Sequence, residues 1–153
     1  MSQPRQMQKK DIGAVGDLWK YVYKTEHPSV SDEELVSTYI AMVNECLPNA
    51  VAASTGYVYE IDDNIVGFIT LDPNRTSGNR SYINNLYVGS EYRRREDATE
   101  LVKQAQKLYD YLYLHVFEDA IPAISLYEKV GFTRVCEKVG GNNDKIFMKW
   151  SRD

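Results

Sequence analysis

The spacing of hydrophobic and polar residues predicts helices in the first third of the chain, after a polar start and one short strand. From Ile12 to Tyr23 the apolar residues recur three and four positions apart, as on the buried face of an amphipathic helix. Ser31 and Glu34 have the spacing of a capping box, so a second helix is expected to begin there and run toward Cys46. Pro48 is expected to end that helix.

The middle of the chain changes to strand-like segments bounded by turn residues. Tyr57 to Ile61 and Ile65 to Leu71 flank the turn Asp62-Asp63-Asn64, which predicts a hairpin. Residues 72–79 contain proline and glycine and are expected to form a loop. A third strand is predicted from Ser81 to Val88.

The second half is predicted to alternate helices with strands. In chain order we expect a helix from near Glu96 to Tyr109, a strand from Leu112 to Val116, a helix from Ala120 to Lys129, and strands over Phe132–Val139 and Lys145–Trp150. Pro122 falls in the first turn of its helix, where a missing N–H costs little, and Gly131 suits a left-handed helix cap. The order of elements predicts an α/β fold, with a mixed sheet and helices on its faces.

Composition indicates a single globular domain spanning residues 1–153. The chain has 18 basic and 22 acidic residues, a net charge of −4, and 43% apolar residues. These values argue against disorder and against a dedicated nucleic-acid binder. The longest clean apolar run, Ile65 to Leu71, is too short to span a membrane, and the first thirty residues lack an apolar signal core, so we expect a cytoplasmic protein that does not bind membranes. With only two histidines, a metal site is not expected.

Three consecutive arginines mark a candidate anion site. Arg93, Arg94 and Arg95 stand between a predicted strand and the start of a predicted helix. A helix N-terminus attracts phosphate through its free N–H groups and dipole, and arginine adds forked donors. The alternative is a solvated charge run neutralised by neighbouring acidic residues. The residues alone leave both interpretations open.

The segment "YINNLYVGSEYRRREDATELV", followed later by "AISLYEKVGF", resembles the GNAT superfamily of acetyl-CoA-dependent N-acetyltransferases. The residues that carry the resemblance are Leu86, Val88, Arg93, Ala98, Ala123, Leu126, Tyr127, Gly131 and Phe132. The segment "EHPSVSDEEL" also looks like the start of the substrate-side helix of small bacterial members. The resemblance implies the GNAT fold: a mixed, mostly antiparallel, splayed central sheet of about seven strands, with helices on both faces.

The resemblance also implies a binding mode for acetyl-CoA as co-substrate, without a metal. The pantetheine arm would lie between the strand ending at Val88 and the strand from Leu112 to Val116, and backbone N–H groups of residues 94–99 would hold the pyrophosphate. The implied cofactor-binding residues are Leu86, Tyr87, Val88, Arg93, Arg94, Arg95, Glu96, Asp97, Ala98, Thr99, Ala120 and Ala123. Tyr127 would be the catalytic general acid that protonates the departing thiolate, because a phenol with a pKa near 10 stays protonated at neutral pH.

Two positions depart from the family pattern. Glu96 stands where the pyrophosphate loop usually has its first glycine, and Ala120 stands where many members carry an asparagine. A carboxylate at ~4 Å from a phosphate costs about 1 kcal/mol in water and more where water is excluded. Glu96 and Asp97 also suit the first turn of a helix. A non-catalytic module with a degenerate coenzyme A loop is therefore the alternative to an active enzyme.

The acceptor side carries no transferable motif. We expect a primary amine of a small molecule or peptide as acceptor, with Glu26, His27, Asn84 and Asn85 as substrate-binding residues. The asparagines cannot act as bases, so we expect a water relay to a carboxylate such as Glu26 or Glu60, with His27 as the alternative base. His115 is expected to be structural, and the family makes a homodimer possible.

Overall fold

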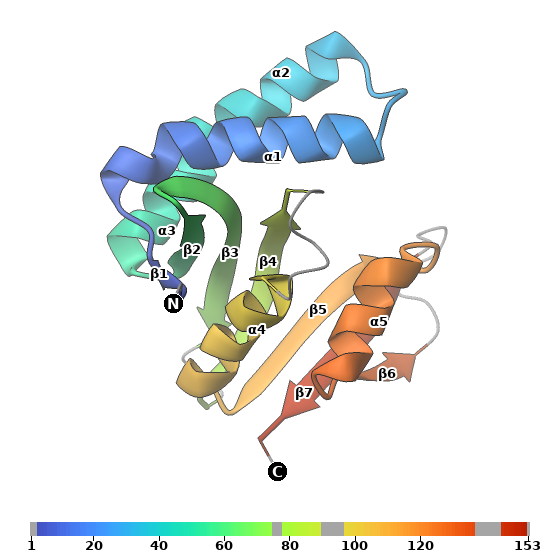
Figure 1. Cartoon of the computed structure of the whole chain (residues 1–153). Coiled ribbons are helices and arrows are strands. Elements are labelled where there is room, and N and C mark those ends of the chain that lie inside the picture. The colour runs from blue at the N-terminus through green and yellow to red at the C-terminus, as the bar shows by residue number, and fades with distance from the viewer. Residues whose placement is uncertain (1–2, 75–77, 90–96, 137–144, 153) are drawn as a thin grey trace.

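The computed structural model describes residues 3–74, 78–89, 97–136 and 145–152. In these residues seven strands form one sheet in the order β1-β2-β3-β4-β5-β7-β6 (Figure 1). The strands are β1 Arg5–Gln6, β2 Gly56–Ile61, β3 Asn64–Asn74, β4 Arg80–Val88, β5 Tyr111–Phe117, β6 Thr133–Cys136 and β7 Lys145–Ser151. The helices are α1 Ile12–Glu26, α2 Asp32–Ala41, α3 Leu47–Ala53, α4 Asp97–Leu108 and α5 Ile121–Lys129, with a 3₁₀ turn over Lys9–Asp11 and a π turn over Met42–Cys46.

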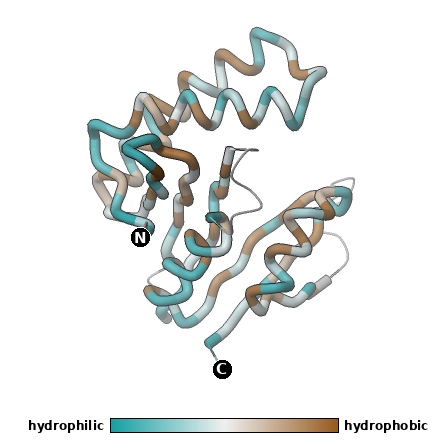
Figure 2. Tube along the Cα trace, viewed as in Figure 1, coloured by the Kyte–Doolittle hydropathy of each residue, from teal (hydrophilic) through white to brown (hydrophobic). Residues whose placement is uncertain are grey.

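The helices cover the sheet on both faces, as predicted. Helices α1 to α3 pack on one face of the N-terminal strands, and α4 and α5 pack on the opposite face (Figure 1). The core under α1 to α3 includes Val15, Trp19, Leu47, Val58 and Phe68. The core under α4 and α5 includes Ile69, Leu101, Leu112, Leu114 and Met148. Figure 2 shows the apolar residues concentrated in the strands and on the inner sides of the helices.

The helical caps and turns that the sequence predicts are present. The Ser31 hydroxyl accepts a hydrogen bond from the Glu34 backbone N–H at 3.1 Å, which starts α2. The hairpin turn between β2 and β3 contains Asp62 and Asp63, both with positive φ. Gly131 has a φ of +102°, a left-handed conformation that glycine adopts without strain. Of the strand expected over 132–139, β6 covers Thr133–Cys136, and residues 137–139 lie outside the described residues.

The expectation that Pro48 ends the second helix is wrong. The chain stays helical from α2 through the π turn into α3, which ends at Ala53. The Leu47 backbone N–H bonds to the Met42 carbonyl, five residues back, so the helix changes register there. Pro48 consequently lies in the first turn of α3, where its missing N–H is not needed.

The sheet is splayed between β4 and β5, its only parallel pair among the described strands. These strands pair over three positions, Arg80–Tyr82 against Tyr111–Tyr113. Beyond them β4 continues to Val88 paired with β3, and β5 continues to Phe117 paired with β7. Figure 1 shows the two strands moving apart toward α1. We call this region of backbone divergence the β4–β5 opening.

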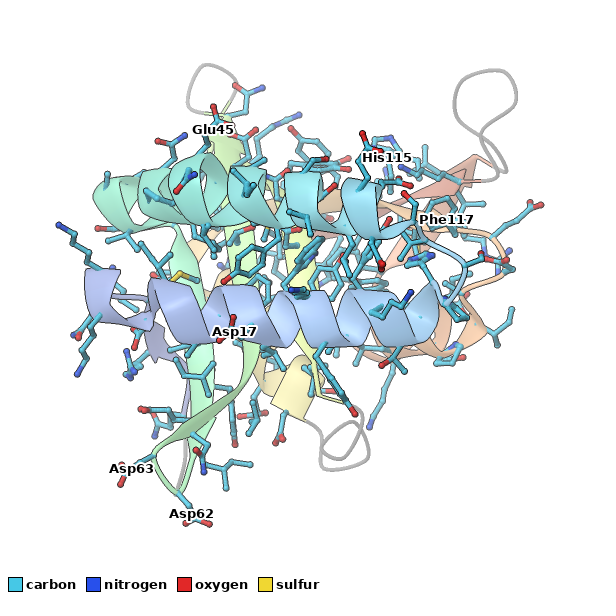
Figure 3. The ribbon with its side chains drawn as sticks, turned by 90° about the horizontal axis from the view of Figure 1, so that it is seen from above. Asp17, Glu45, Asp62, Asp63, His115 and Phe117 are labelled. Atoms are coloured by element: carbon cyan, nitrogen blue, oxygen red, sulfur yellow. The ribbon has the colours of Figure 1, made fainter. Side chains whose placement is uncertain are left out.

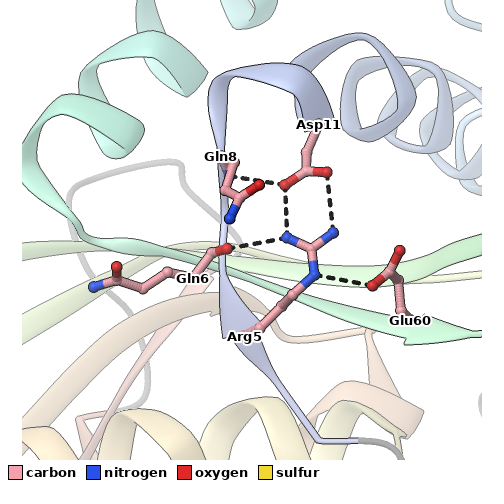
Figure 4. A network of polar contacts seen from close by, with 5 residues as sticks. All are labelled: Arg5, Gln6, Gln8, Asp11 and Glu60. Atoms are coloured by element: carbon pink, nitrogen blue, oxygen red, sulfur yellow. Dashed lines mark hydrogen bonds and ion pairs between the residues drawn. The ribbon is translucent and has the colours of Figure 1, made fainter. Parts of the chain in front are cut away.

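A buried ion pair ties the start of α1 to the first two strands. The Arg5 guanidinium donates to both carboxylate oxygens of Asp11, at 2.8 and 3.1 Å, and to Glu60 Oε1 at 2.9 Å (Figure 4). The Gln8 backbone N–H donates to Asp11 Oδ2 at 2.7 Å. Asp11 is 5% exposed, so the chain turns into α1 around a buried charge that is fully hydrogen-bonded. This arrangement fixes where α1 begins over the sheet.

Candidate active site

Most of the predicted cofactor-binding residues that the structure describes lie on β4 and in the first turns of α4 and α5. On the β4 side lie Leu86, Tyr87 and Val88, and Gly89 N–H closes the strand by bonding to the Val66 carbonyl at 2.9 Å. Because β4 is paired with β3 but diverges from β5, its inner edge faces the opening. A strand edge of this kind can bind an extended chain of amide groups.

Helix α4, which contacts β3 and β4, begins at Asp97, close to the helix start that the sequence predicts. Its first turn contains Asp97, Ala98 and Thr99, of which Asp97 is 2% and Thr99 4% exposed. The side chains of Asp97 and Thr99 therefore pack inward. The three arginines and Glu96 lie outside the described residues, so their predicted contacts with pyrophosphate remain predictions.

Helix α5 flanks the opening from the side of β5. Ala120 is its N-cap and makes no side-chain cap bond, and Pro122 lies in the first turn as predicted. Ala123, one residue further, packs against the core under α4 and α5. The Ala120 backbone N–H donates to the Phe117 carbonyl at 3.0 Å, so the start of α5 lies close to the end of β5.

Tyr127 is buried at the point where α5 faces the opening. It is 7% exposed, and its ring lies 5.5 Å from that of Phe132. Burial raises the pKa of Tyr127 strongly, and the nearby phenols of Tyr87 and Tyr82 raise it further. Tyr127 belongs to the same core cluster as Val88 of β4 and Leu114 of β5. Because the pKa is raised, the hydroxyl is protonated at neutral pH.

Tyr82 and His115 bridge the two strands at the start of the opening. The Tyr82 hydroxyl lies 2.9 Å from His115 Nδ1, and their rings are 5.5 Å apart. Burial lowers the pKa of His115, and the positive charge of Lys145 lowers it further. The imidazole is therefore neutral at pH 7. His115 and Phe117 extend to the same side of the sheet (Figure 3).

Aromatic rings surround this pair on the same face. Tyr113 packs edge-on against Tyr82 with a centroid distance of 5.4 Å, and Phe147 packs edge-on against His115 at 5.2 Å. Tyr113 also stacks on Phe147 at 5.9 Å. These contacts hold the imidazole and the phenol in place.

The end of α1 reaches the far end of β4. Glu26 is the last residue of α1, and His27 caps it, with its ring 4.3 Å from that of Tyr23. Burial raises the pKa of Tyr87, and the negative charge of Glu26 raises it further. The predicted acceptor residues Glu26 and His27 therefore lie at the C-terminal end of α1, the helix that packs against β3 and β4.

Asn84 and Asn85 occupy a bulge in β4 and differ in environment. Thr70 pairs with Asn85 and Leu71 with Ile83, so Asn84 is the extra residue of the bulge. Asn84 is exposed and lines a pocket of about 280 Å³ between α3 and β3. The Asn85 side chain instead donates to Thr70 Oγ1 at 2.8 Å and contacts Cys46 Sγ at 3.7 Å. The amide of Asn85 is therefore engaged within the protein.

Glu60 does not lie where a relay from the acceptor could reach it. It sits on β2, two strands away from the β4–β5 opening, and pairs with Arg5 at 2.9 Å. The hydrogen bond from Arg5 lowers the pKa of Glu60, which makes it a weaker base (Figure 4). The expectation that Glu60 serves as a distant base is not supported by this placement.

Sequence reasoning did not single out Tyr82, and it expected His115, which lies on β5, to be structural. Tyr111, Tyr113, His115 and Phe117 alternate along β5, so their spacing alone places them on one face. The pairing partner of that face, Tyr82 on β4, follows from the three-residue parallel register, which the sequence does not reveal. Among the described residues no cluster of His, Cys, Asp and Glu side chains is arranged to hold a metal ion.

Comparison with known proteins agrees with this geometry. Residues 19–132 match the model of the acetyltransferase (GNAT) family. Peptidyl-lysine N-acetyltransferase YiaC of Escherichia coli (strain K12) is 24% identical over 132 residues, covering 84% of this chain and 81% of its own. The fold resembles PaiA N-acetyltransferase of Thermoplasma acidophilum in complex with coenzyme A, with a TM-score of 0.84, 20% identity and 99% coverage of both chains. It also resembles Arabidopsis thaliana Naa50 in complex with the bisubstrate analogue CoA-Ac-MVNAL, with a TM-score of 0.72, 19% identity and 98% coverage of both chains.

The splayed sheet and the matching family model place the protein among the acyltransferases. The chain belongs to the acetyltransferase (GNAT) family and has the GNAT fold. No helix among the described residues combines the length and apolar character needed to cross a bilayer.

Proposed function

We propose that the protein transfers the acetyl group of acetyl-CoA directly to a primary amine of a small molecule or peptide. The observation that carries the proposal is the divergence of β4 from β5 after three paired positions, with the buried Tyr127 of α5 in the core that includes residues of both strands. Membership of the acetyltransferase family supports the reaction class. Two similar proteins support an amine acceptor of the lysine or peptide type: YiaC is a peptidyl-lysine N-acetyltransferase, and Naa50 is in complex with the bisubstrate analogue CoA-Ac-MVNAL.

Acetyl-CoA would lie along the β4 edge. The backbone of Leu86, Tyr87 and Val88 would bind the pantetheine amides, because a strand edge offers alternating N–H and C=O groups. The first turn of α4, Asp97 to Thr99, would direct its N–H groups at the pyrophosphate, together with the predicted arginines. Bound there, acetyl-CoA supplies an activated acyl group as its thioester.

Tyr127 would stabilise the departing thiolate. Its raised pKa keeps the hydroxyl protonated, yet a thiol has a pKa near 8.5, so full proton transfer from the phenol would be uphill. A hydrogen bond from the Tyr127 hydroxyl to sulfur becomes stronger as negative charge develops there. We therefore assign Tyr127 as the hydrogen-bond donor to the sulfur of the leaving group. The thiolate takes up its proton as coenzyme A leaves the site.

The experiment combines acetyl-CoA calorimetry with a consumption assay over a panel of amines. We expect measurable binding and turnover with at least one amine, and a fall in kcat of roughly 100-fold in Tyr127→Phe with little change in acetyl-CoA affinity. Tyr57→Phe is the matched control, because Tyr57 is also 7% exposed but lies on β2. Absence of binding heat at millimolar acetyl-CoA would overturn the proposed function. Unchanged turnover in Tyr127→Phe would overturn the assignment of Tyr127.

The acidic start of α4 favours a second candidate, a ligand-binding module that no longer holds coenzyme A tightly. Asp97 and Glu100 lie in the first turn, where negative charge opposes an anion, and Glu96 precedes them. Glu96→Gly separates the two functions. If the native loop is impaired, the substitution should tighten coenzyme A binding about tenfold; tight binding that the substitution leaves unchanged would exclude this candidate. The homodimer and the cytoplasmic location remain predictions.

A further inference from the structure

We propose that the pocket between α3 and β3 recognises the group next to the acceptor amine, and that this group is small and carries a hydroxyl or a carboxamide. The inference rests on the proposed function and names the class of acceptor within it. This α3–β3 pocket has a volume of about 280 Å³, at the small end of ligand pockets. Its lining residues with polar or thiol groups are Cys46, Asn49, Thr55, Thr70, Asp72 and Asn84.

Two breaks in regular backbone geometry meet at the α3–β3 pocket. The π turn ends at Cys46, and the bulge in β4 makes Asn84 an extra residue of that strand. Both residues line the pocket. Asn85, which follows the bulge, donates to Thr70 Oγ1 at 2.8 Å and contacts Cys46 Sγ at 3.7 Å. Such breaks change the direction of side chains and are frequent beside functional sites, and here the contacts of Asn85 hold the two breaks together.

The α3–β3 pocket adjoins the place where the thioester would lie. The first half of α4 lies at the Val88 end of β4, because a Cβ on Gly67 would lie 3.0 Å from Val88 Cγ2 and 3.2 Å from Leu101 Cδ1. With the pyrophosphate at the start of α4, the pantetheine arm would run back along β4 from Val88 to Leu86. The thioester at the end of that arm would then lie on the Asn84 side of Leu86, and these two residues are about 7 Å apart along the strand. An amine held by the pocket would therefore lie near the reacting carbon.

The lining of the α3–β3 pocket favours a neutral polar group over an acidic or apolar one. Asn49 of α3 and Asn84 of β4 each bring an amide, which both donates and accepts. The Thr70 hydroxyl is 1% exposed and accepts from Asn85, so its own proton can be donated to a ligand oxygen. Among the described residues that line the pocket none is basic, and the Asp72 carboxylate would repel a second carboxylate. A hydroxyl or carboxamide can pair with these groups, whereas a methyl group offers the Thr70 proton no acceptor.

The test measures kcat/KM for two matched pairs of acceptors. Serine amide and 2-aminobutyramide differ by a hydroxyl in place of a methyl group, and asparagine amide and the 1-amide of aspartate differ by a carboxamide in place of a carboxylate. We expect the wild-type protein to prefer the hydroxyl by about five- to tenfold, and the carboxamide by at least as much. The first pair, placed at the first position of a pentapeptide, shows whether the amine belongs to a free small molecule or to a peptide.

Variants of α3 assign the preference to the pocket. Asn49→Ala removes one amide from an exposed position, and Ala53→Trp fills the pocket from the exposed end of α3. We expect Asn49→Ala to reduce the hydroxyl preference at least about twofold, and Ala53→Trp to raise the KM for serine amide roughly tenfold or more. Acetyl-CoA affinity should remain that of wild type in both variants. Asn44→Ala is the matched control, because Asn44 is exposed on the π turn and does not line the pocket.

The outcomes separate the role of the α3–β3 pocket from the proposed function. Turnover without preference for the hydroxyl, or a preference that Asn49→Ala and Ala53→Trp leave unchanged, would overturn the role of the pocket while leaving the acetyltransferase intact. Turnover confined to lysine side chains would do the same. A wild-type protein without turnover on any amine would overturn the proposed function, and the role of the pocket with it.

Discussion

Replacing Asp11 by asparagine should destabilise the protein more than the same substitution at Asp17. Asp11 is 5% exposed and accepts three hydrogen bonds, two from Arg5 at 2.8 and 3.1 Å and one from the Gln8 backbone at 2.7 Å. The side-chain bond from Arg5 is the main reason that the pKa of Asp11 is lowered. Asparagine keeps the size of the side chain but removes the charge and one acceptor.

The cost follows from the geometry. Hydrogen bonds to charged groups contribute about 1.5–3 kcal/mol each, and the substitution abolishes one and weakens another. Arg5 keeps its bond to Glu60 and its side chain is 31% exposed, so its charge is not stranded. The loss therefore stays below the 3–5 kcal/mol typical of a broken buried pair, at about 2–3 kcal/mol. In a domain of this size that lowers Tm by roughly 5–10 °C.

Urea unfolding of wild type and Asp11→Asn at a series of pH values measures this loss. A carboxylate with a lowered pKa stabilises the fold fully above its unfolded pKa, near 3.9, and progressively less as pH falls through its folded pKa. The difference between the two proteins should thus be constant from pH 7 down to about 5 and narrow in stronger acid. Asp17→Asn is the control, because Asp17 of α1 is exposed and accepts a hydrogen bond from the Tyr39 hydroxyl at 3.0 Å (Figure 3). Equal stabilities of Asp11→Asn and Asp17→Asn would refute the reasoning.

Two further outcomes follow from local geometry. Gly131→Ala should lower the free energy of unfolding in urea by about 1–2 kcal/mol, because φ is +102° and a Cβ would lie 3.1 Å from Trp150 Cδ1. Gly13→Ala in α1 is the control and should be neutral or stabilising, because the space around its Cβ is open. Alkylation of Cys46, followed by peptide-resolved mass spectrometry, should be slower in the native protein than in urea, because burial raises the pKa of this thiol. For the same reason the native rate should still increase with pH above 8.5. Equal native and denatured rates at pH 7 would contradict this.

Local patterns predict the elements of this fold well where a residue type has one strong preference. Ser31 begins α2, the Asp62–Asp63 turn joins β2 to β3, and Gly131 adopts the left-handed conformation, each as expected from sequence. Pro48 was misleading because proline is compatible with two outcomes, the end of a helix or the first turn of a new one. The choice depends on Leu47, which is fully buried in the core under α1, and such packing is not visible in a local window.

The candidate site likewise contains some features that local sequence predicts and others that depend on long-range pairing. The position of Tyr127 follows from its spacing to Gly131 and Phe132, which are near it in sequence. The contact between Tyr82 and His115 joins residues 33 positions apart and depends on the register of a three-residue parallel pairing. The pairing of Arg5 with Glu60 spans 55 positions and engages a carboxylate that sequence analysis names as a possible distant base. Long-range register and charge pairing are the properties that no local pattern encodes.

The splay between β4 and β5 also bears on solubility. A sheet ordinarily leaves its unsatisfied edges at the two outermost strands, where they invite other polypeptides to add on and aggregate. Here an edge of β4 is opened inside the sheet, with α4 and α5 on one side and the end of α1 above it (Figure 1). The elements on both sides of this edge leave less room for a second polypeptide chain than an outermost strand does. The fold thus places this strand edge inside the sheet, where intermolecular strand pairing is hindered.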